Sequence, residues 1–186
     1  MRRIDELILV VGPSSAGKSF LISRIREREE PVLQAQLGMI MPEAWAYLTA
    51  DQFARTDNAD TVRVLVHYDL CQQYRNGIFN HLPAMLYRAE KTTLLTLSVT
   101  SETLRERNRV RLNAVIRRML GGSLWAYEWK TLRYMLHLSR IYKRDEAVKA
   151  LYGKWFAFAD PLHEVAHWTL DPTSTPLVAT PAVRGS

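Results

Sequence analysis

The hydrophobic positions of the chain form two kinds of pattern that follow each other along the sequence. Short apolar or alternating runs rich in β-branched residues predict strands, at residues 7–11, 46–48, 61–68, 92–99 and 164–170. Apolar residues at helical spacing predict helices between them, from 18 to before Pro31, from 52, over 71–88 with a break near Pro83, from a cap at Thr100 and Ser101 to Gly121, and over 124–137 and 141–158. Strands that alternate with helices predict an α/β protein, here a three-layer sandwich with a mainly parallel five-stranded sheet.

Polar and glycine- or proline-rich segments separate these elements. Residues 56–60 predict a turn, and Gly121 to Ser123 predict a break between two helices. Asp171 to Ser174 close the last strand, and Pro176 and Pro181 mark an extended tail.

A glycine-framed loop follows the first strand. Residues 12–19, GPSSAGKS, fit the pattern G-x-x-x-x-G-K-[ST] and lie between an apolar strand and a helix, which is the context that a phosphate-binding loop needs. Gly12 and Gly17 let the backbone turn so that its amides point into one concavity, and the helix N-terminus adds partial positive charge. The predicted nucleotide-binding residues of this loop are Gly12, Pro13, Ser14, Ser15, Ala16, Gly17, Lys18, Ser19 and Phe20.

Two side chains of the loop have predicted roles of their own. Lys18 can bridge the β- and γ-phosphates of a nucleoside triphosphate, and the Ser19 hydroxyl can bind Mg²⁺. The loop therefore predicts ATP or GTP as a cofactor together with Mg²⁺.

Two aspartates follow predicted strands. In an open α/β sheet ligands bind at the carboxyl ends of the strands, so Asp51 and Asp69 are candidates for the base that accepts the acceptor proton. Asp69 is also a candidate ligand of Mg²⁺ beside Ser19. For both residues a simple helix cap is the alternative, for Asp51 at a helix that starts at Gln52.

The predicted helix after residue 100 is rich in arginine. Arg105 and Arg109 share one face, and Arg107 and Arg111 share another. Arg105 and Arg109 are the predicted contacts to the transferred phosphoryl group. The alternative is a solvated face whose arginines pair with acidic residues, here Glu102 and Glu106.

Composition narrows the partners. The net charge of +6 and the pI near 9.6 suit anionic ligands such as nucleotides. Basic residues alternate with aromatic residues between 124 and 158, as in some nucleic-acid-binding surfaces, but no nucleic-acid-binding motif accompanies them, so such a partner is not expected. The single cysteine, Cys71, excludes an intrachain disulfide, and no apolar stretch is long enough to span a membrane, so a cytoplasmic protein is expected.

The chain resembles the small P-loop kinases of the nucleoside and nucleotide kinase superfamily. The loop GPSSAGKS is similar to those of chloramphenicol-phosphotransferase-like and guanylate-kinase-like enzymes, and LTADQF resembles the second-strand segment whose aspartate is the base. SVTSETLRERNRVR resembles the strand and arginine helix that lead to the lid, and HWTLDPTSTP resembles the last strand and the loop beside the purine.

The resemblance has several implications. It implies the strand order 2-3-1-4-5, and it places Asp171 and Thr173 beside the nucleotide base. It also implies a P-loop kinase-like domain over 1–172 with an aromatic helical insertion at 122–160, and a C-terminal tail at 173–186.

Together these patterns predict an ATP- or GTP-dependent phosphotransferase that acts on a hydroxyl of a small molecule, with a homodimer as an allowed state. A sulfotransferase with a related donor-phosphate loop is an alternative, although the Lys18–Ser19 pair argues against it. The second alternative is a nucleotide-binding switch that docks a partner through its aromatic helices.

Overall fold

The computed structural model describes residues 4–39, 44–55, 63–75, 82–121 and 125–182. The turn predicted at 56–60 and the break predicted at 122–123 lie outside these ranges. The elements are β1 (Ile4–Gly12), α1 (Lys18–Arg26), α2 (Pro31–Gln36), β2 (Ala46–Thr49), α3 (Ala50–Arg55), β3 (Arg63–Asp69), α4 (Leu70–Arg75), α5 (Leu82–Tyr87), β4 (Ala89–Leu97), α6 (Ser101–Leu120), α7 (Trp125–Tyr142), α8 (Asp145–Ala159), β5 (Ala166–Leu170) and β6 (Thr180–Pro181).

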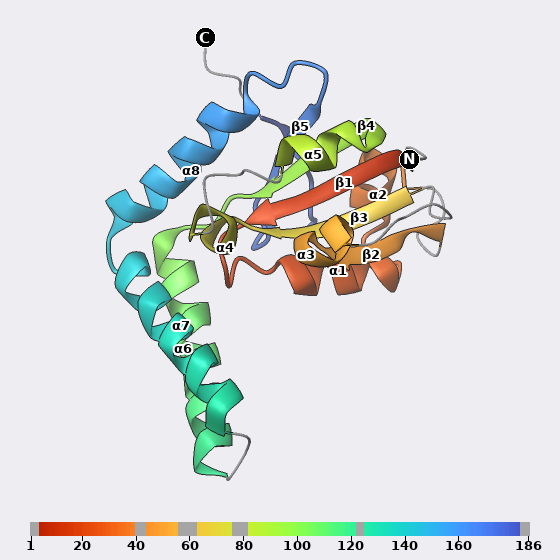
Figure 1. The fold of residues 1–186 in the computed structure, drawn as a ribbon. Coiled ribbons are helices and arrows are strands. Elements are labelled where there is room, and N and C mark those ends of the chain that lie inside the picture. The colour runs from red at the N-terminus through yellow and green to blue at the C-terminus, as the bar shows by residue number, and fades with distance from the viewer. Residues whose placement is uncertain (1–3, 40–43, 56–62, 76–81, 122–124, 183–186) are drawn as a thin grey trace.

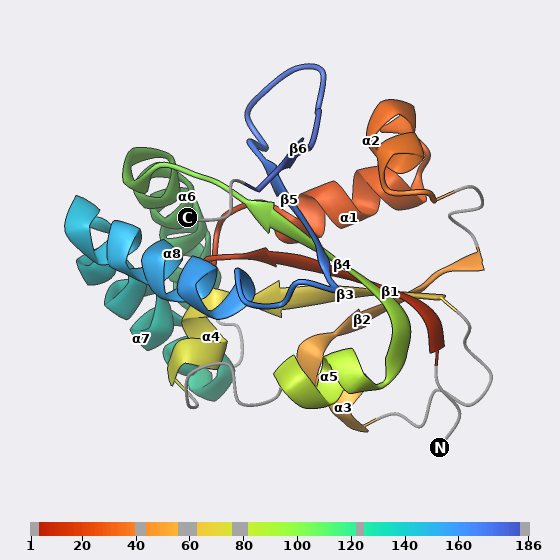
Figure 2. The ribbon, with the colours of Figure 1, turned by 90° about the horizontal axis from the view of Figure 1, so that it is seen from above.

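The strands form one sheet in the order β2-β3-β1-β4-β5-β6 (Figures 1 and 2). All neighbours are parallel except β5 and β6, which are antiparallel. The order predicted for the first five strands is confirmed, and so is the α/β sandwich. The predicted number of strands was one too low, because residues of the expected tail pair with β5, with Thr180 opposite Thr169.

Helices cover both faces of the sheet and make it the middle layer of three. Even-numbered residues of β1, Ile8 and Val10, pack into a core with Leu21 and Ile25 of α1. The odd-numbered residues of β1 face the opposite core because side chains alternate along a strand. There they pack with residues of α3, α5 and α8, among them Phe53, Met85 and Trp155.

One predicted helix boundary was wrong. The break expected after His137 does not occur, because Leu138 and Tyr142 continue the buried face of α7, and the chain turns only at Arg144. The stretch predicted as helical with a break near Pro83 contains two helices, α4 and α5, and residues 76–81 between them lie outside the described ranges. Pro83 begins no new break within α5. It lies in the first turn of α5, where its missing amide hydrogen removes no helical hydrogen bond.

The carboxyl ends of the parallel strands lie at one edge, where strand order reverses around β1. There Gly12 is the register partner of Asp69, and a Cβ built on Gly12 would lie 3.3 Å from Cβ of Leu97 in β4. This edge is where ligands bind in open α/β sheets. Within the described ranges, no helix combines the length and the apolar composition that a bilayer crossing requires.

Trp155 is the largest fully buried side chain, and it gives a test of the packing between α8 and the sheet. Its indole nitrogen donates to Thr96 Oγ1 at 2.8 Å, and its ring lies 6.1 Å from that of Tyr68. Trp155→Ala should lower the free energy of unfolding by about 3–5 kcal/mol in urea denaturation. The matched control is Trp129→Ala on α7, which is 53% exposed and should change stability by less than about 0.5 kcal/mol. Equal losses would contradict this packing.

Candidate functional site

The loop between β1 and α1 has the backbone turns that its glycines permit. The Ala16 amide donates to Pro13 O at 3.1 Å, and Ser15 and Gly17 have positive φ angles of 69° and 102°. A Cβ on Gly17 would lie 3.1 Å from Nη1 of the flexible Arg107 side chain, so the positive φ, more than the space, favours glycine there. The loop is therefore a tight turn that only glycine allows at position 17.

Several loop amides remain free to bind an anion. Among hydrogen bonds between described residues, none is donated by the amides of Ser15, Gly17, Lys18, Ser19 or Phe20. The last three belong to the first turn of α1, whose amides have no partner within the helix and whose N-terminus carries partial positive charge. Consecutive free amides at a helix start are a recurrent anion-binding arrangement.

Lys18 is buried beneath this loop. Its ammonium group donates to Gly12 O at 2.7 Å and to Pro13 O at 2.6 Å, and it lies 3.4 Å from Oδ2 of Asp69. Burial lowers the pKa of Lys18, while the charge of Asp69 opposes this change. Two of the three N–H groups are thus held by short bonds to loop carbonyls, and the third donates to Asp69. Because the side chain is only 2% exposed, the third N–H would donate to a phosphate oxygen only in place of Asp69.

Asp69 is a helix cap, one of the two roles that the sequence left open for it, and its carboxylate also faces the loop. Its Oδ1 accepts from the amides of Cys71 at 2.9 Å and Gln72 at 3.3 Å, so the carboxylate caps α4. Its Oδ2 faces the loop and accepts from Ser14 Oγ at 2.6 Å. Burial alone would raise the pKa of Asp69, but the ammonium of Lys18 and these hydrogen bonds hold it below its usual value. The residue is therefore an ionised carboxylate at neutral pH.

Two tyrosines of α7 contact the same loop. Ser14 Oγ donates its hydrogen to Asp69, so the 2.8 Å bond between Ser14 Oγ and Tyr134 Oη is donated by the tyrosine. Tyr142 Oη donates to Ser14 O at 2.6 Å. Burial raises the pKa of both phenols, so both stay protonated and remain donors. No local pattern in the sequence indicates these contacts, since 120 or more residues separate the partners.

The arginine helix reaches the loop through a different face from the one predicted. Arg107 Nη1 donates to Ala16 O at 2.8 Å, and Arg111 Nη1 donates to Ser15 Oγ at 3.1 Å. Arg105 and Arg109 are exposed on α6 and have no hydrogen bond or ion pair among the described residues. The i, i+4 spacing of Arg107 and Arg111 was visible in the sequence, but the face of α6 that meets the loop was not.

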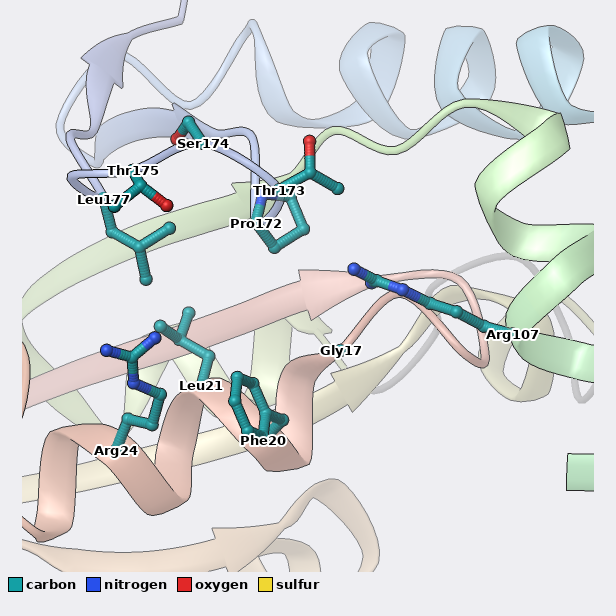
Figure 3. A pocket seen from close by; sticks show the side chains of 10 residues that line it. All are labelled: Gly17, Phe20, Leu21, Arg24, Arg107, Pro172, Thr173, Ser174, Thr175 and Leu177. Atoms are coloured by element: carbon teal, nitrogen blue, oxygen red, sulfur yellow. The ribbon is translucent and has the colours of Figure 1, made fainter. Parts of the chain in front are cut away.

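A cavity of about 320 Å³ lies beside the loop, over the first turns of α1 (Figure 3). Its size falls at the lower end of the range of small-molecule sites, roughly 300–1,000 Å³. Arg107 extends over it from α6 toward Pro172. It is lined by Gly17, Phe20, Leu21, Arg24, Arg107, Pro172, Thr173, Ser174, Thr175 and Leu177.

The loop after β5 forms the wall of the cavity opposite α1. Asp171 Oδ1 accepts from the Thr173 amide at 2.8 Å and from Thr173 Oγ1 at 2.6 Å. Thr173 lines the cavity, whereas Asp171 does not and instead shapes the turn that presents Thr173. Asp171 and Thr173, which were predicted to lie near the nucleotide base, are thus next to this cavity: Thr173 lines it, and Asp171 supports the turn.

Asp51 and Ser19 are both exposed. Asp51 does not cap α3, because Thr49 Oγ1 accepts from the Gln52 amide at 3.2 Å and the Thr49 amide donates to Gln52 Oε1 at 2.8 Å. The alternative interpretation of Asp51 as a cap is therefore wrong, and its carboxylate has no hydrogen bond with another described side chain.

A Mg²⁺ ion bound together with a nucleotide would need few ligands from this site. Within the described ranges, no three or more His, Cys, Asp or Glu side chains are grouped as for a metal ion. Mg²⁺ bound with a nucleotide needs only one or two protein oxygens, because phosphates and waters supply the rest. The Ser19 hydroxyl next to the free amides and the ionised Asp69 at the same strand edge are donors of that kind.

Comparison with known proteins adds no assignment: no protein-family model and no curated protein matches the chain.

The low pKa of Asp69 has a consequence for acid stability. As the pH falls through about 3.9, the aspartate of the unfolded chain takes up a proton while the folded one does not, so stability falls with pH. On acidification from neutral pH to below this point, the unfolding free energy of Asp69→Asn should fall less than that of the wild type. The difference should be about 1.4 kcal/mol for each unit by which the pKa of Asp69 differs between the folded and unfolded chains. Denaturant titrations across this range measure it.

The control for this prediction is Asp51→Asn, which removes an exposed carboxylate that has no hydrogen bond or ion pair with another described side chain and should follow the acid profile of the wild type. Identical acid profiles for Asp69→Asn and the wild type would show that Asp69 is not stabilised in its ionised form.

Proposed function

We propose that the protein binds a nucleoside triphosphate at the β1–α1 loop and transfers its terminal phosphoryl group to a hydroxyl of a small molecule. The observation that supports this most is the set of free amides of Ser15, Gly17, Lys18, Ser19 and Phe20 around the start of α1, next to a cavity of about 320 Å³. The triphosphate would accept from these amides. The purine base of the nucleotide would occupy the cavity between α1 and the loop after β5.

The charges around the loop suit a phosphate group. Arg107 and Arg111 bring two guanidinium groups to loop atoms, and Lys18 lies beneath them. Asp69 offsets one of these charges, so the loop region keeps a net positive charge. Such fixed donors stabilise the charge on a transferring phosphoryl group without rearrangement. We therefore assign this role to Arg107 and Arg111, in place of the predicted pair.

The acceptor hydroxyl would attack the γ-phosphorus while the bond to the bridging oxygen of the leaving diphosphate breaks. Its proton needs a base, and Asp69 is a poor candidate, which leaves Asp51 of the two predicted aspartates. The pKa of Asp69 is already lowered, which makes its carboxylate a weak proton acceptor and a good partner for a cation. Mg²⁺ bound to Ser19 and Asp69 would neutralise part of the phosphate charge.

The resemblance to small P-loop kinases supports the same function. The sheet order around β1 is the one that the resemblance implies, and the loop after β5 lines the cavity. A second function is favoured by the bonds of Tyr134 and Tyr142 to Ser14, since they would couple a bound nucleotide to α7. The protein would then be a nucleotide-dependent switch without turnover.

Isothermal calorimetry with ATP, GTP and adenosine 3′,5′-bisphosphate, with and without Mg²⁺, tests the donor. We expect ATP or GTP to bind in a Mg²⁺-dependent way. Lys18→Ala should reduce turnover by about 100-fold or more, equivalent to roughly 3 kcal/mol of transition-state stabilisation. Lys91→Ala, which alters an exposed lysine on β4, is the control. Binding of the bisphosphate alone would reject the kinase, and nucleotide binding without turnover on a panel of hydroxyl acceptors would favour the switch.

Two arginines of α6 give a matched pair of variants. Arg107→Ala removes a guanidinium that touches the loop and lines the cavity, so it should weaken ATP or GTP binding by about ten- to 100-fold, as expected for a charged hydrogen bond of roughly 1.5–3 kcal/mol. Arg109→Ala, two residues further along the same helix, should leave the affinity within about twofold of the wild type, because its side chain is exposed elsewhere. The reverse order of effects would restore the assignment made from sequence.

A further inference from the structure

The positive charge of the protein is concentrated in one helical hairpin. Residues 101–144 contain eleven of the 25 Lys and Arg residues but only three of the 19 Asp and Glu residues. Their net charge is therefore +8 against +6 for the whole chain, and the remaining residues are net negative. Figure 1 shows α6 and α7 extending side by side away from the sheet, so this charge lies on an arm and not around the cavity alone.

Specific side chains fix how α6 and α7 pack. Buried Asn108 donates to Met135 O at 3.0 Å and to Ser139 Oγ at 2.7 Å. Further along the arm, Arg118 makes two bonds to Glu128, at 2.6 and 3.2 Å, which occupies one of the few carboxylates there. These contacts determine which face of α7 is turned toward solvent.

The solvent face of α7 carries a stripe at alternating spacings of four and three residues. Its members are Trp129, Arg133, Leu136, Arg140 and, just after the helix ends, Lys143. All five are exposed, Trp129 by 53% and Leu136 by 44%. At 1.5 Å per residue the stripe is about 21 Å long. We call these five residues the α7 stripe.

The α7 stripe contains no carboxylate, and neither does the sequence from 129 to 144. Arg133, Arg140 and Lys143 form no ion pair with any other described residue, unlike Arg118. A row of cations that no neighbouring carboxylate neutralises attracts a polyanion that lies along it.

We propose that the α7 stripe binds single-stranded nucleic acid. Arg133, Arg140 and Lys143 would contact successive phosphates, and a base would stack on the exposed ring of Trp129. A membrane surface fits less well, because a helix that lies in a membrane buries a wide apolar face. The apolar face of α7, with Met135, Leu138 and Tyr142, is instead buried in the protein.

This proposal differs from the expectation drawn from the sequence and does not depend on nucleotide binding at the loop. The sequence showed basic and aromatic residues interleaved over a long segment, most of whose aromatic side chains were expected to pack. The fold separates them: Tyr142 and Trp155 are buried, whereas Trp129 shares the exposed face with three cations.

Fluorescence anisotropy with the full chain and a labelled oligothymidylate of about 16 nucleotides, at several NaCl concentrations, tests the proposal. The triple variant Arg133→Ala/Arg140→Ala/Lys143→Ala should bind at least tenfold more weakly. The slope of log K against log[NaCl] should become shallower by about 2, since each contact with a single strand contributes about 0.7. Trp129→Ala should weaken binding about tenfold and leave the slope unchanged.

The matched control removes three positive charges elsewhere, as Arg55→Ala/Lys91→Ala/Lys149→Ala, all exposed and outside the arm. It should bind like the wild type. The proposal is overturned if the wild type does not bind at low salt, or if the control loses as much affinity as the stripe variant. It is also overturned if a duplex of equal length binds as tightly as the single strand and Trp129→Ala does not change that affinity. Binding of phosphatidylserine vesicles alone, weakened by the triple variant, would overturn it as well.

Discussion

The buried pairing of Lys18 with Asp69 is the interaction on which the arrangement of the site depends. It joins the helix after β1 to the end of β3, and the hydroxyl of Ser14 ties the loop to the same carboxylate. A buried charge without a partner is costly, so each member requires the others. Two N–H groups of Lys18 hold loop carbonyls, and the free backbone amides of the turn remain able to donate to an outside anion.

The α6–α7 arm is connected to this pairing at two levels. From α6, two arginines contact loop atoms, and from α7 two tyrosines donate to Ser14, whose hydroxyl in turn donates to Asp69. A chain of hydrogen bonds in a region of low dielectric is stronger than its separate parts. The tyrosines on one side of α7 therefore join the helix to the loop, and the solvent-facing stripe lies on the other side of the same helix.

The sequence allowed much of the fold to be predicted, where the signal was local. The buried run of β1, the glycines and the helix after them identified the strand, the loop and α1, because only glycine tolerates the φ angle at position 17. Thr100 was expected to cap α6, and its hydroxyl accepts from the Thr103 amide. Local patterns were less informative at Thr180, because its strand partner, Thr169, belongs to another segment of the chain.

The sequence by itself determined the alternation of strands and helices, the phosphate-loop pattern and the presence of acids and arginines around it, because each is written in neighbouring residues. Only the tertiary structure decided which of these side chains meet. Asp69 joins the loop while also capping α4, whereas Thr49 takes the cap expected of Asp51. Arg107, and not Arg105 or Arg109, reaches Ala16, because the packing of α6 on α7 fixes the rotation of α6 about its axis. Residues far apart in sequence set that packing.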